Sequence, residues 1–372
     1  MDKQKSGMTS ILVAYDYCNL GGVTSVFKQR LRMMPVLMPT FHFMFAKDLG
    51  GRAELLGLDG VRVDLCPNGE FRNWVTNHLL CAKPQTIEAV ILIDQPEILH
   101  AMVEGGFFSK PDRPRVVYEI HTSLERTFTR MLDVDFRMVD SIVVPSRWLK
   151  RKVQELLPTL PVDLITIIPN FIDRTLFEML DETDATLSDA AAPLVVWIGK
   201  LVADKNFVDA CKIMKQLSTR RKIKPVFVSG GAAEQPQVVD FLSTLALHGL
   251  IDDAFWIANL PNYDVPKLLN RARRTGGLFL STSKFESFGL SILEALSCGL
   301  PAVAAGVGGV PEVIENGYGG YLFDVGENAE AASLCELVLE NPLEHSRAAH
   351  ASSIRFDGTS IASTYRDIVI GL

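Results

Sequence analysis

Two glutamates, Glu286 and Glu294, are separated by seven residues within a glycine-rich stretch, residues 281–324. A pair of carboxylates could serve as the acid and the nucleophile of a glycoside hydrolase. Carboxylates also accept hydrogen bonds from hydroxyl groups, so the same pair could hold a sugar without reacting with it. Alternatively, both glutamates could be surface residues without a function. That interpretation fits Glu294 taken alone, but it does not explain the surrounding glycines.

The segment around the glutamates has the pattern of a strand, a loop and a helix. The apolar run Leu278–Leu280 leads into it, and the helical run Leu290–Leu296 follows the first glutamate. This order places Glu286 in the loop and Glu294 about a turn and a half into the helix. The amino end of a helix presents free N–H groups and a positive dipole end, which suit an anion. A phosphate flanked by hydroxyl-rich rings would satisfy all these groups, and this describes a nucleotide-sugar.

Two lysines, Lys200 and Lys205, flank the turn after another predicted strand, Leu194–Ile198. Ammonium groups can balance the charge that grows on a diphosphate leaving group when a glycosyl bond breaks. The presence of these two lysines in a site of the nucleotide-binding type argues against a glycoside hydrolase. We therefore interpret both glutamates as hydroxyl-binding residues.

The rest of the chain alternates predicted strands and helices, which indicates parallel sheets covered by helices. A length of 372 residues favours two domains. An acidic, non-periodic connection, Leu180–Pro193, separates two such series. The strands predicted for the first series are Ile11–Tyr15, Thr40–Phe45, Val61–Leu65, Ala89–Ile93, Val116–Ile120, Ser141–Val144 and Leu164–Ile168.

Ligands of such sheets gather beyond the carboxyl ends of the strands. Gly21 and Gly22 follow the first predicted strand, where they could form a tight turn or let the backbone approach a ligand. His121 comes immediately after Val116–Ile120, and it could be structural or ligand-binding. The basic segment Arg147–Lys152 favours a solvated helix face, with weak peripheral membrane contact left open.

Composition narrows the class of protein. The chain has no run of 18 apolar residues, and its first ten residues lack the apolar core of a signal peptide. These features predict a cytoplasmic protein. A net charge of −7 argues against binding to nucleic acid. The six cysteines form no C-x-x-C pair and the seven histidines are dispersed, so we expect no metal site.

Four segments resemble the retaining nucleotide-sugar glycosyltransferases of the GT-B fold that carry the E-x7-E motif. They are FESFGLSILEALSCGLPAVAAGVGGVPEVIENGYGGYLF, IGKLVADKN, VPSRWLKRKV and IPNFID. The resemblance implies two Rossmann-like, doubly wound α/β domains with parallel sheets that face each other across a cleft. Residues 1–173 would bind the acceptor and residues 174–356 the donor. A C-terminal helix, 357–372, would cross back onto the first domain.

The resemblance also implies roles for individual residues. Glu294 would bind the ribose, and Glu286 would hold hydroxyls of the transferred sugar. The implied catalytic residues are His121, Glu286 and Lys205. The implied donor-binding residues are Gly21, Gly22, Gly199, Lys200, Lys205, Phe288, Gly289, Leu290 and Glu294. Asn206 stands where the family often has glycine.

The function implied is retaining transfer of a hexose from a UDP- or GDP-sugar to an acceptor hydroxyl. The acceptor would be a small molecule, a glycan or a lipid, and neither a metal nor a cofactor beyond the donor would be needed. An epimerase, a phosphorylase or a non-catalytic nucleotide-sugar-binding subunit on the same fold are the alternatives. The sequence does not specify the donor base, the acceptor or the oligomeric state.

Overall fold

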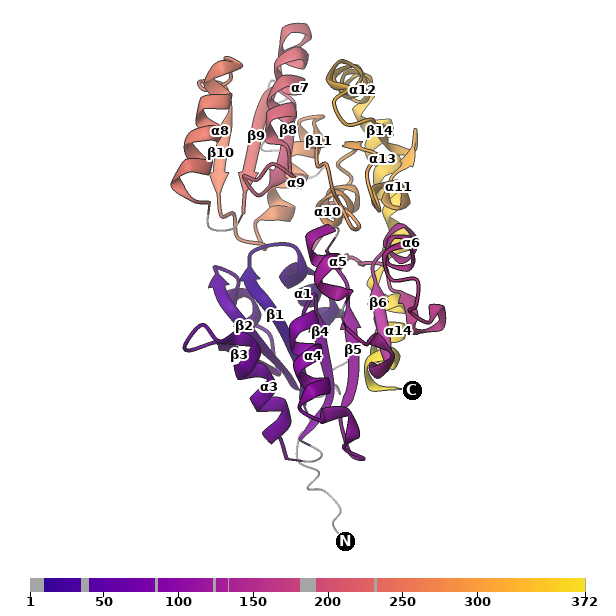
Figure 1. The fold of residues 1–372 in the computed structure, drawn as a ribbon. Helices are drawn as coiled ribbons and strands as arrows, with labels where there is room; N and C mark the ends of the chain where they lie inside the picture. The colour runs from indigo at the N-terminus through magenta and orange to yellow at the C-terminus, as the bar shows by residue number, and fades with distance from the viewer. Residues whose placement is uncertain are drawn as a thin grey trace. The chain divides into compact units, whose positions relative to one another are not determined.

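The computed structural model of the chain describes residues 10–34, 40–83, 86–122, 125–132, 134–180, 192–230 and 233–371. Within them the strands form two sheets of seven parallel strands each (Figure 1). This arrangement confirms the predicted α/β class. The contacts divide the chain into two compact units. Unit 1 takes the described residues of Met1–Asn19, Val26–Pro169 and Thr359–Leu372, and unit 2 takes those of Leu20–Ser25 and Asn170–Gly358.

The sheet of unit 1 has the strand order β3-β2-β1-β4-β5-β6-β7. The strands are β1 (Ser10–Asn19), β2 (Thr40–Leu49), β3 (Val61–Leu65), β4 (Ile87–Ile93), β5 (Arg115–Glu119), β6 (Ser141–Val144) and β7 (Ile165–Ile167). The helices are α1 (Val23–Met33), α2 (Arg52–Leu56), α3 (Phe71–Cys81), α4 (Pro96–Glu104), α5 (Glu125–Met131), α6 (Arg147–Leu156) and α14 (Gly358–Ile370), with short 3-10 turns η1 (Phe107–Ser109), η2 (Phe136–Met138) and η3 (Val162–Leu164).

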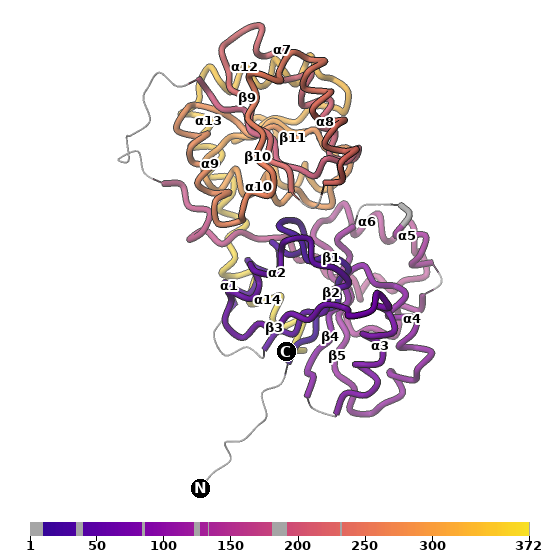
Figure 2. The backbone as a smooth tube through the Cα atoms, turned by 90° about the vertical axis from the view of Figure 1, so that its left-hand side faces the viewer, coloured from indigo at the N-terminus to yellow at the C-terminus, as the bar shows by residue number. Residues whose placement is uncertain are grey.

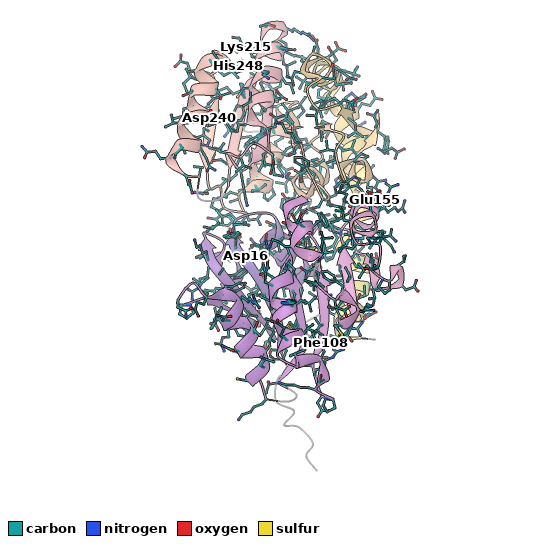
Figure 3. All side chains as sticks on the ribbon, viewed as in Figure 1. Asp16, Phe108, Glu155, Lys215, Asp240 and His248 are labelled. Atoms are coloured by element: carbon teal, nitrogen blue, oxygen red, sulfur yellow. The ribbon has the colours of Figure 1, made fainter. Side chains whose placement is uncertain are left out.

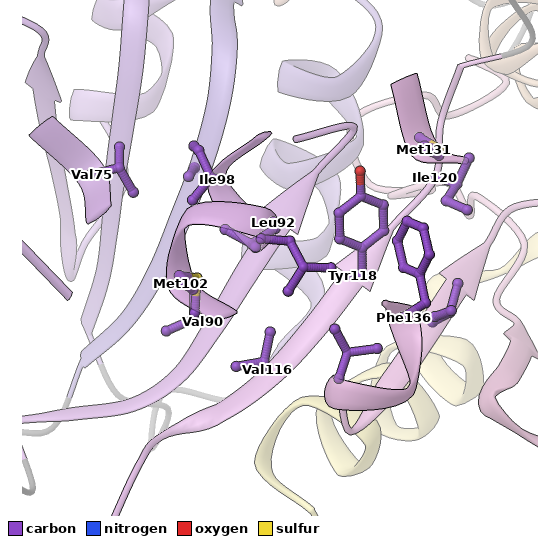
Figure 4. Close-up of a cluster of buried hydrophobic side chains, with 14 of the residues drawn as sticks. Val75, Val90, Leu92, Ile98, Met102, Val116, Tyr118, Ile120, Met131 and Phe136 are labelled. Atoms are coloured by element: carbon purple, nitrogen blue, oxygen red, sulfur yellow. The ribbon is translucent and has the colours of Figure 1, made fainter. Parts of the chain in front are cut away.

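Alternate residues of the central strands pack against different helices, because successive side chains of a strand point to opposite faces. Val116 and Tyr118 of β5 lie in the cluster that includes Ile98 and Met102 of α4 (Figure 4). Glu119, which lies between Tyr118 and Ile120, points to the opposite face of the sheet. There its carboxylate accepts hydrogen bonds from Arg30 of α1 and Tyr365 of α14. The C-terminal segment containing α14 is seen in Figure 2 as the yellow tube within unit 1.

The sheet of unit 2 has the strand order β10-β9-β8-β11-β12-β14-β13. Its strands are β8 (Leu194–Gly199), β9 (Lys224–Ser229), β10 (Phe255–Ala258), β11 (Leu278–Ser281), β12 (Ala302–Ala305), β13 (Glu315–Asn316) and β14 (Gly319–Phe323). Its helices are α7 (Phe207–Arg220), α8 (Gln235–Leu247), α9 (Val265–Arg274), α10 (Leu290–Ser297), α11 (Val310–Val313), α12 (Asn328–Glu340) and α13 (Pro342–Ser353), followed by the 3-10 turn η4 (Ile354–Phe356).

Two apolar clusters cover the two faces of this second sheet. Val196 and Phe279 share one cluster with α9 and α10, while Val195 and Leu278 share the other with α7 and α12. Both faces of a parallel sheet are therefore buried, which explains why its strands read as continuous apolar runs. None of the helices in the described part of the chain has the length and apolarity of a membrane span.

Several elements differ from the expectations from sequence, and β2 continues to Leu49 where the prediction ended at Phe45. β1 continues to Asn19 and does not end at Tyr15, because it stays paired with β2 as far as Leu49. The short strand β13 and the helix α13 had no clear sequence pattern. The acidic connection, apart from Leu180, Ala192 and Pro193, lies outside the described residues.

Candidate functional site

The loops that follow β8 and β11 are held together at the carboxyl edge of the unit 2 sheet. The two strands are neighbours in that sheet. Trp197 Nε1 donates to Thr282 Oγ1 at 3.1 Å, and Thr282 Oγ1 donates to the Asn206 carbonyl at 2.8 Å. The backbone N–H of Lys284 donates to the Asp204 carbonyl at 2.7 Å. These hydrogen bonds connect residues 199–206 with residues 281–289.

Lys205 and Glu286, from the two loops, form an ion pair between Nζ and Oε1. Ser283 Oγ donates to the same carboxylate oxygen at 2.8 Å. The two charged side chains are 30% and 14% exposed, so water and a ligand can reach the pair. The structure therefore brings together two of the three residues predicted to be catalytic.

The position of Glu286 depends on a pair of glycines in the loop after β12. The N–H of Gly309 donates to the Glu286 carbonyl at 3.0 Å. A Cβ at Gly308, whose φ is +58°, would overlap that same carbonyl oxygen. A Cβ at Gly309 would overlap the Ser287 carbonyl and lie 2.9 Å from Phe288 Cα. Only glycine permits this contact between two stretches of backbone.

The helix α10 begins directly after this loop. Gly289 has φ +103°, and its carbonyl accepts from the N–H groups of Ile292 and Leu293, both at 3.1 Å. The N–H groups at the start of a helix have no carbonyl four residues earlier to donate to, so that of Leu290 is available to an anion. Phe288 is 2% exposed and packs edge-on against Phe356, which limits its predicted donor contact to the backbone. Glu294 is the fifth residue of α10 and is buried.

The loop after β8 contains three more of the singled-out positions. A Cβ at Gly199 would lie 2.8 Å from the Trp197 ring, so packing alone requires glycine there. Asn206 has φ +54°, a conformation that asparagine tolerates better than most residues. This explains why it can stand where glycine is common. Lys200 is exposed, and partial loss of hydration together with the nearby Lys205 ammonium lowers its pKa.

His121 belongs to unit 1, where it follows β5. Its Nε2 lies 2.7 Å from Glu119 Oε2, and its backbone N–H donates to Asp94 Oδ1 at 3.1 Å. Glu119 is fully buried and also accepts from Arg30 NH1, at 3.0 and 2.7 Å, and from the Tyr365 hydroxyl, at 2.5 Å. The histidine is thus the outermost member of a buried network that joins β5, α1 and α14.

The charge state of Glu119 determines which ring nitrogen of His121 carries a hydrogen. Burial alone would raise the pKa of Glu119, but the Arg30 charge and the hydrogen bonds from His121 and Tyr365 lower it to about 2. An ionised carboxylate can only accept hydrogen bonds. His121 Nε2 therefore carries a hydrogen, and in the neutral ring Nδ1 is the acceptor nitrogen.

Gly21 and Gly22 lie in the segment Leu20–Ser25, which groups with unit 2. Gly22 has φ +58°, and no atom of the described residues lies within 4 Å of a Cβ placed at either glycine. The turn requires glycine at position 22 for its conformation. Packing leaves room for a side chain at both positions, in contrast to Gly199.

Sequence reasoning missed several residues that build these surroundings. They are Arg30, Glu119, Thr282, Ser283, Gly308, Gly309 and Tyr365. Glu119 carried a signal, since a carboxylate within the apolar run VVYEI needs a partner. Among the described residues, no group of three or more histidine, cysteine, aspartate and glutamate side chains could hold a metal ion.

Comparison with known proteins indicates the family of the second half of the chain. Residues 181–354 match the family "Glycosyl transferases group 1". The chain is 25% identical to alpha-maltose-1-phosphate synthase of Mycolicibacterium smegmatis, over 59% of this chain and 57% of that protein. It is 28% identical to N-acetyl-alpha-D-glucosaminyl L-malate synthase of Bacillus anthracis, over 55% and 53%. The chain thus spans little more than half the length of these relatives.

A solved structure extends the similarity of fold to nearly the whole chain. The Anabaena protein HepE, in complex with UDP and glucose, has a TM-score of 0.80 and 19% identity, and the match covers 98% of this chain and 100% of that one. Residues 181–354 therefore match a glycosyl transferases group 1 domain, and the chain has the two-sheet GT-B fold, as its sequence motifs predicted.

Proposed function

We propose that the chain transfers a hexose from a UDP- or GDP-sugar to an acceptor hydroxyl, with retention of the anomeric configuration. The observation that carries this proposal is the accessible Lys205–Glu286 pair beside the amino end of α10. It combines cations and N–H donors for a diphosphate with carboxylates for sugar hydroxyls. The binding of UDP and glucose by HepE supports a donor of this kind.

The diphosphate would lie against the start of α10. The N–H of Leu290 would donate to a phosphate oxygen, and the ammonium groups of Lys200 and Lys205 would balance the charge of the leaving group. That charge increases as the glycosyl bond breaks, so these groups bind the transition state more strongly than the substrate. They also supply the positive charge that a divalent metal gives other enzymes. We therefore propose a metal-independent reaction.

The carboxylates would hold hydroxyl groups at the two ends of the donor. Glu294 would accept from the ribose, and Glu286, fixed by Ser283 and by the glycine turn, would accept from the hexose. His121 Nδ1 would accept from a hexose hydroxyl, because Glu119 holds the other ring nitrogen. Gly21 and Gly22 would let the backbone approach the donor. The incoming hydroxyl would attack on the face from which the diphosphate leaves.

A donor titration tests this proposal directly. UDP-glucose and GDP-mannose would be titrated into the full chain by calorimetry, and the anomeric configuration of the product would be read by NMR. We expect Lys205→Ala to lower transfer by about 10²–10³-fold, the usual effect of removing one group that stabilises a leaving charge. Glu294→Ala should abolish donor binding while the protein stays folded.

Lys215→Ala is the matched control, because Lys215 is exposed on α7, away from the carboxyl edge (Figure 3). It should behave as the unmodified chain. Turnover at the unmodified rate in both Lys205→Ala and Glu294→Ala would overturn the assignment. So would an epimerised sugar without acceptor, or glycan cleavage that depends on phosphate.

A further inference from the structure

A pocket of about 470 Å³ lies in unit 1, near the point where the pairing of β1 with β4 ends. Its volume is in the range of small-molecule sites, about 300–1,000 Å³. Asp16 of β1, Gln95 after β4 and Arg130 of α5 form part of its wall. Figure 3 shows Asp16 toward one end of the unit and Phe108, which follows α4, toward the other. The pocket therefore lies at the carboxyl edge of the sheet, where ligands of such folds bind.

The arginines of this pocket already face carboxylates. Arg130 makes a two-pronged contact with Glu97, from Nε to Oε1 at 2.5 Å and from NH2 to Oε2 at 2.6 Å. Arg72 NH2 lies 3.6 Å from Glu104 Oε2. The two-pronged geometry is the one that a guanidinium would otherwise offer a phosphate. A phosphorylated ligand would have to displace Glu97 first.

The carboxylates of the pocket oppose a second anion. Its lining contains three of them, Asp16, Glu70 and Glu97, against two arginines. Glu70 and Glu97 stand at the starts of α3 and α4, where an anion would otherwise profit from the helix dipoles. Burial raises the pKa of Asp16, which shows that negative charge is already unfavourable there.

The neutral groups of the pocket suit hydroxyls. Gln95 is 3% exposed. Its Nε2 has no hydrogen-bond partner of normal geometry among the described residues, but the amide already interacts with the Asp16 carboxyl and lowers its pKa against the effect of burial. A hydroxyl between the two groups can accept from the amide and donate to the carboxylate. The apolar lining residues, Phe71 and Ile98, are 8% and 0% exposed and offer no surface for an acyl chain.

The pocket wall is tied to His121 through the residue before Gln95. Asp94 Oδ1 accepts from the backbone N–H groups of His121 and Thr122, at 3.1 and 3.4 Å. Burial raises the pKa of Asp94 to about 6, and the Asp16 charge adds to this effect. Asp16, Asp94 and His121 therefore lie within or just after three adjacent strands, β1, β4 and β5. A molecule in this pocket would lie close to His121.

We propose that this pocket binds the acceptor, and that the acceptor is an uncharged polyhydroxylated compound, a sugar or polyol without phosphate and without a lipid tail. The inference rests on the proposed transfer function and adds the substrate class. Asp16 accepts a hydrogen bond from one acceptor hydroxyl, and Gln95 donates to another. Arg130 lies close enough to Asp16 to lower the pKa of its carboxyl, so the negative charge of Asp16 is partly balanced within the pocket.

A matched acceptor panel tests this with the full chain and the donor that it binds. Hexoses and polyols would be compared with the same compounds carrying one phosphate, and with a short-chain alkyl glycoside. Release of the nucleotide above the rate without acceptor is the readout. We expect kcat/KM to be at least about tenfold higher for the uncharged member of each pair, a difference of about 1.4 kcal/mol. Preference for the phosphorylated or the alkylated member would overturn the inference.

Variants separate this proposal from the function on which it rests. Asp16→Asn should raise the acceptor KM about tenfold and leave the donor Kd unchanged. Glu97→Gln frees Arg130 and should raise kcat/KM for the phosphorylated member. Asp112→Asn, at an exposed position before β5, should change neither value. An unchanged acceptor KM in Asp16→Asn would refute the pocket assignment while donor cleavage still stands. A chain that neither binds nor cleaves any donor would refute both proposals.

Discussion

Each unit contains an ion pair that includes or contacts a residue predicted to be catalytic. The two pairs differ in their exposure to water. Arg30 and Glu119 in unit 1 are 1% and 0% exposed, and both oxygens of Glu119 accept hydrogen bonds. Lys205 and Glu286 in unit 2 are 30% and 14% exposed. The first pair is sealed from water, whereas the second remains open to it.

This difference in exposure indicates that the buried pair supports a neighbouring residue, whereas the accessible pair can contact a ligand. Removing one partner of a buried pair leaves an unpaired charge without water, which costs several kcal/mol. An accessible pair can exchange a partner for a ligand at little cost. The Arg30 guanidinium is further held by its stacking on the Tyr365 ring, 4.0 Å from its centre. We conclude that the pair in unit 1 orients His121, and that the pair in unit 2 is accessible to a ligand.

The largest effect on stability is expected from Arg30→Met. It should lower the free energy of unfolding of unit 1 by about 3–5 kcal/mol, because Glu119 stays buried without its cation. Lys205→Met should change the stability of unit 2 by less than about 1 kcal/mol. Hydrogen exchange measured by mass spectrometry reports the two units separately. Equal losses of stability in the two variants would contradict the proposed difference between the two ion pairs.

The next effect concerns acid stability. The pKa of Glu119 is lowered from 4.5 to about 2, so its stabilising contribution is complete above pH 4.5 and is lost as the pH falls toward 2. A shift of this size corresponds to about 3 kcal/mol across that window. Urea unfolding at several pH values should show this loss in the unmodified chain. Glu119→Gln should show a flatter profile between pH 4.5 and 2, and an unchanged slope would contradict the assignment.

The smallest effect should come from Gly309→Ala. The added methyl group would overlap the Ser287 carbonyl, so the loop carrying Glu286 must move. We expect a loss of about 1–3 kcal/mol in stability and weaker donor binding. Gly230→Ala is the control, because no atom lies within 4 Å of a Cβ there and its φ is ordinary. Donor binding that is unchanged in Gly309→Ala would show that the glycine turn does not position Glu286.

Much of the fold followed from patterns within the sequence. The strands predicted at Val61–Leu65 and Ser141–Val144 have the observed bounds of β3 and β6. β6 is buried along its whole length, whereas β3 is an edge strand with Arg62 exposed. β13 was missed because two residues make no pattern, and the end of β1 because its last residues are set by pairing with β2. In the site of unit 2, the strand, loop and helix around Glu286 and Glu294 are contiguous. Local rules were therefore sufficient to place these two residues in a loop and in a helix.

The two-sheet class, the motif with its two glutamates and the loop with its two lysines can be read from the sequence, since each depends on neighbours along the chain. Which groups meet depends on how the chain folds. Glu119 bonds to Arg30 across 89 positions and to Tyr365 across 246, and Lys205 meets Glu286 across 81. Such contacts form because the sheet brings distant strand ends to one edge and stacks helices on its faces. No spacing in the sequence records that geometry.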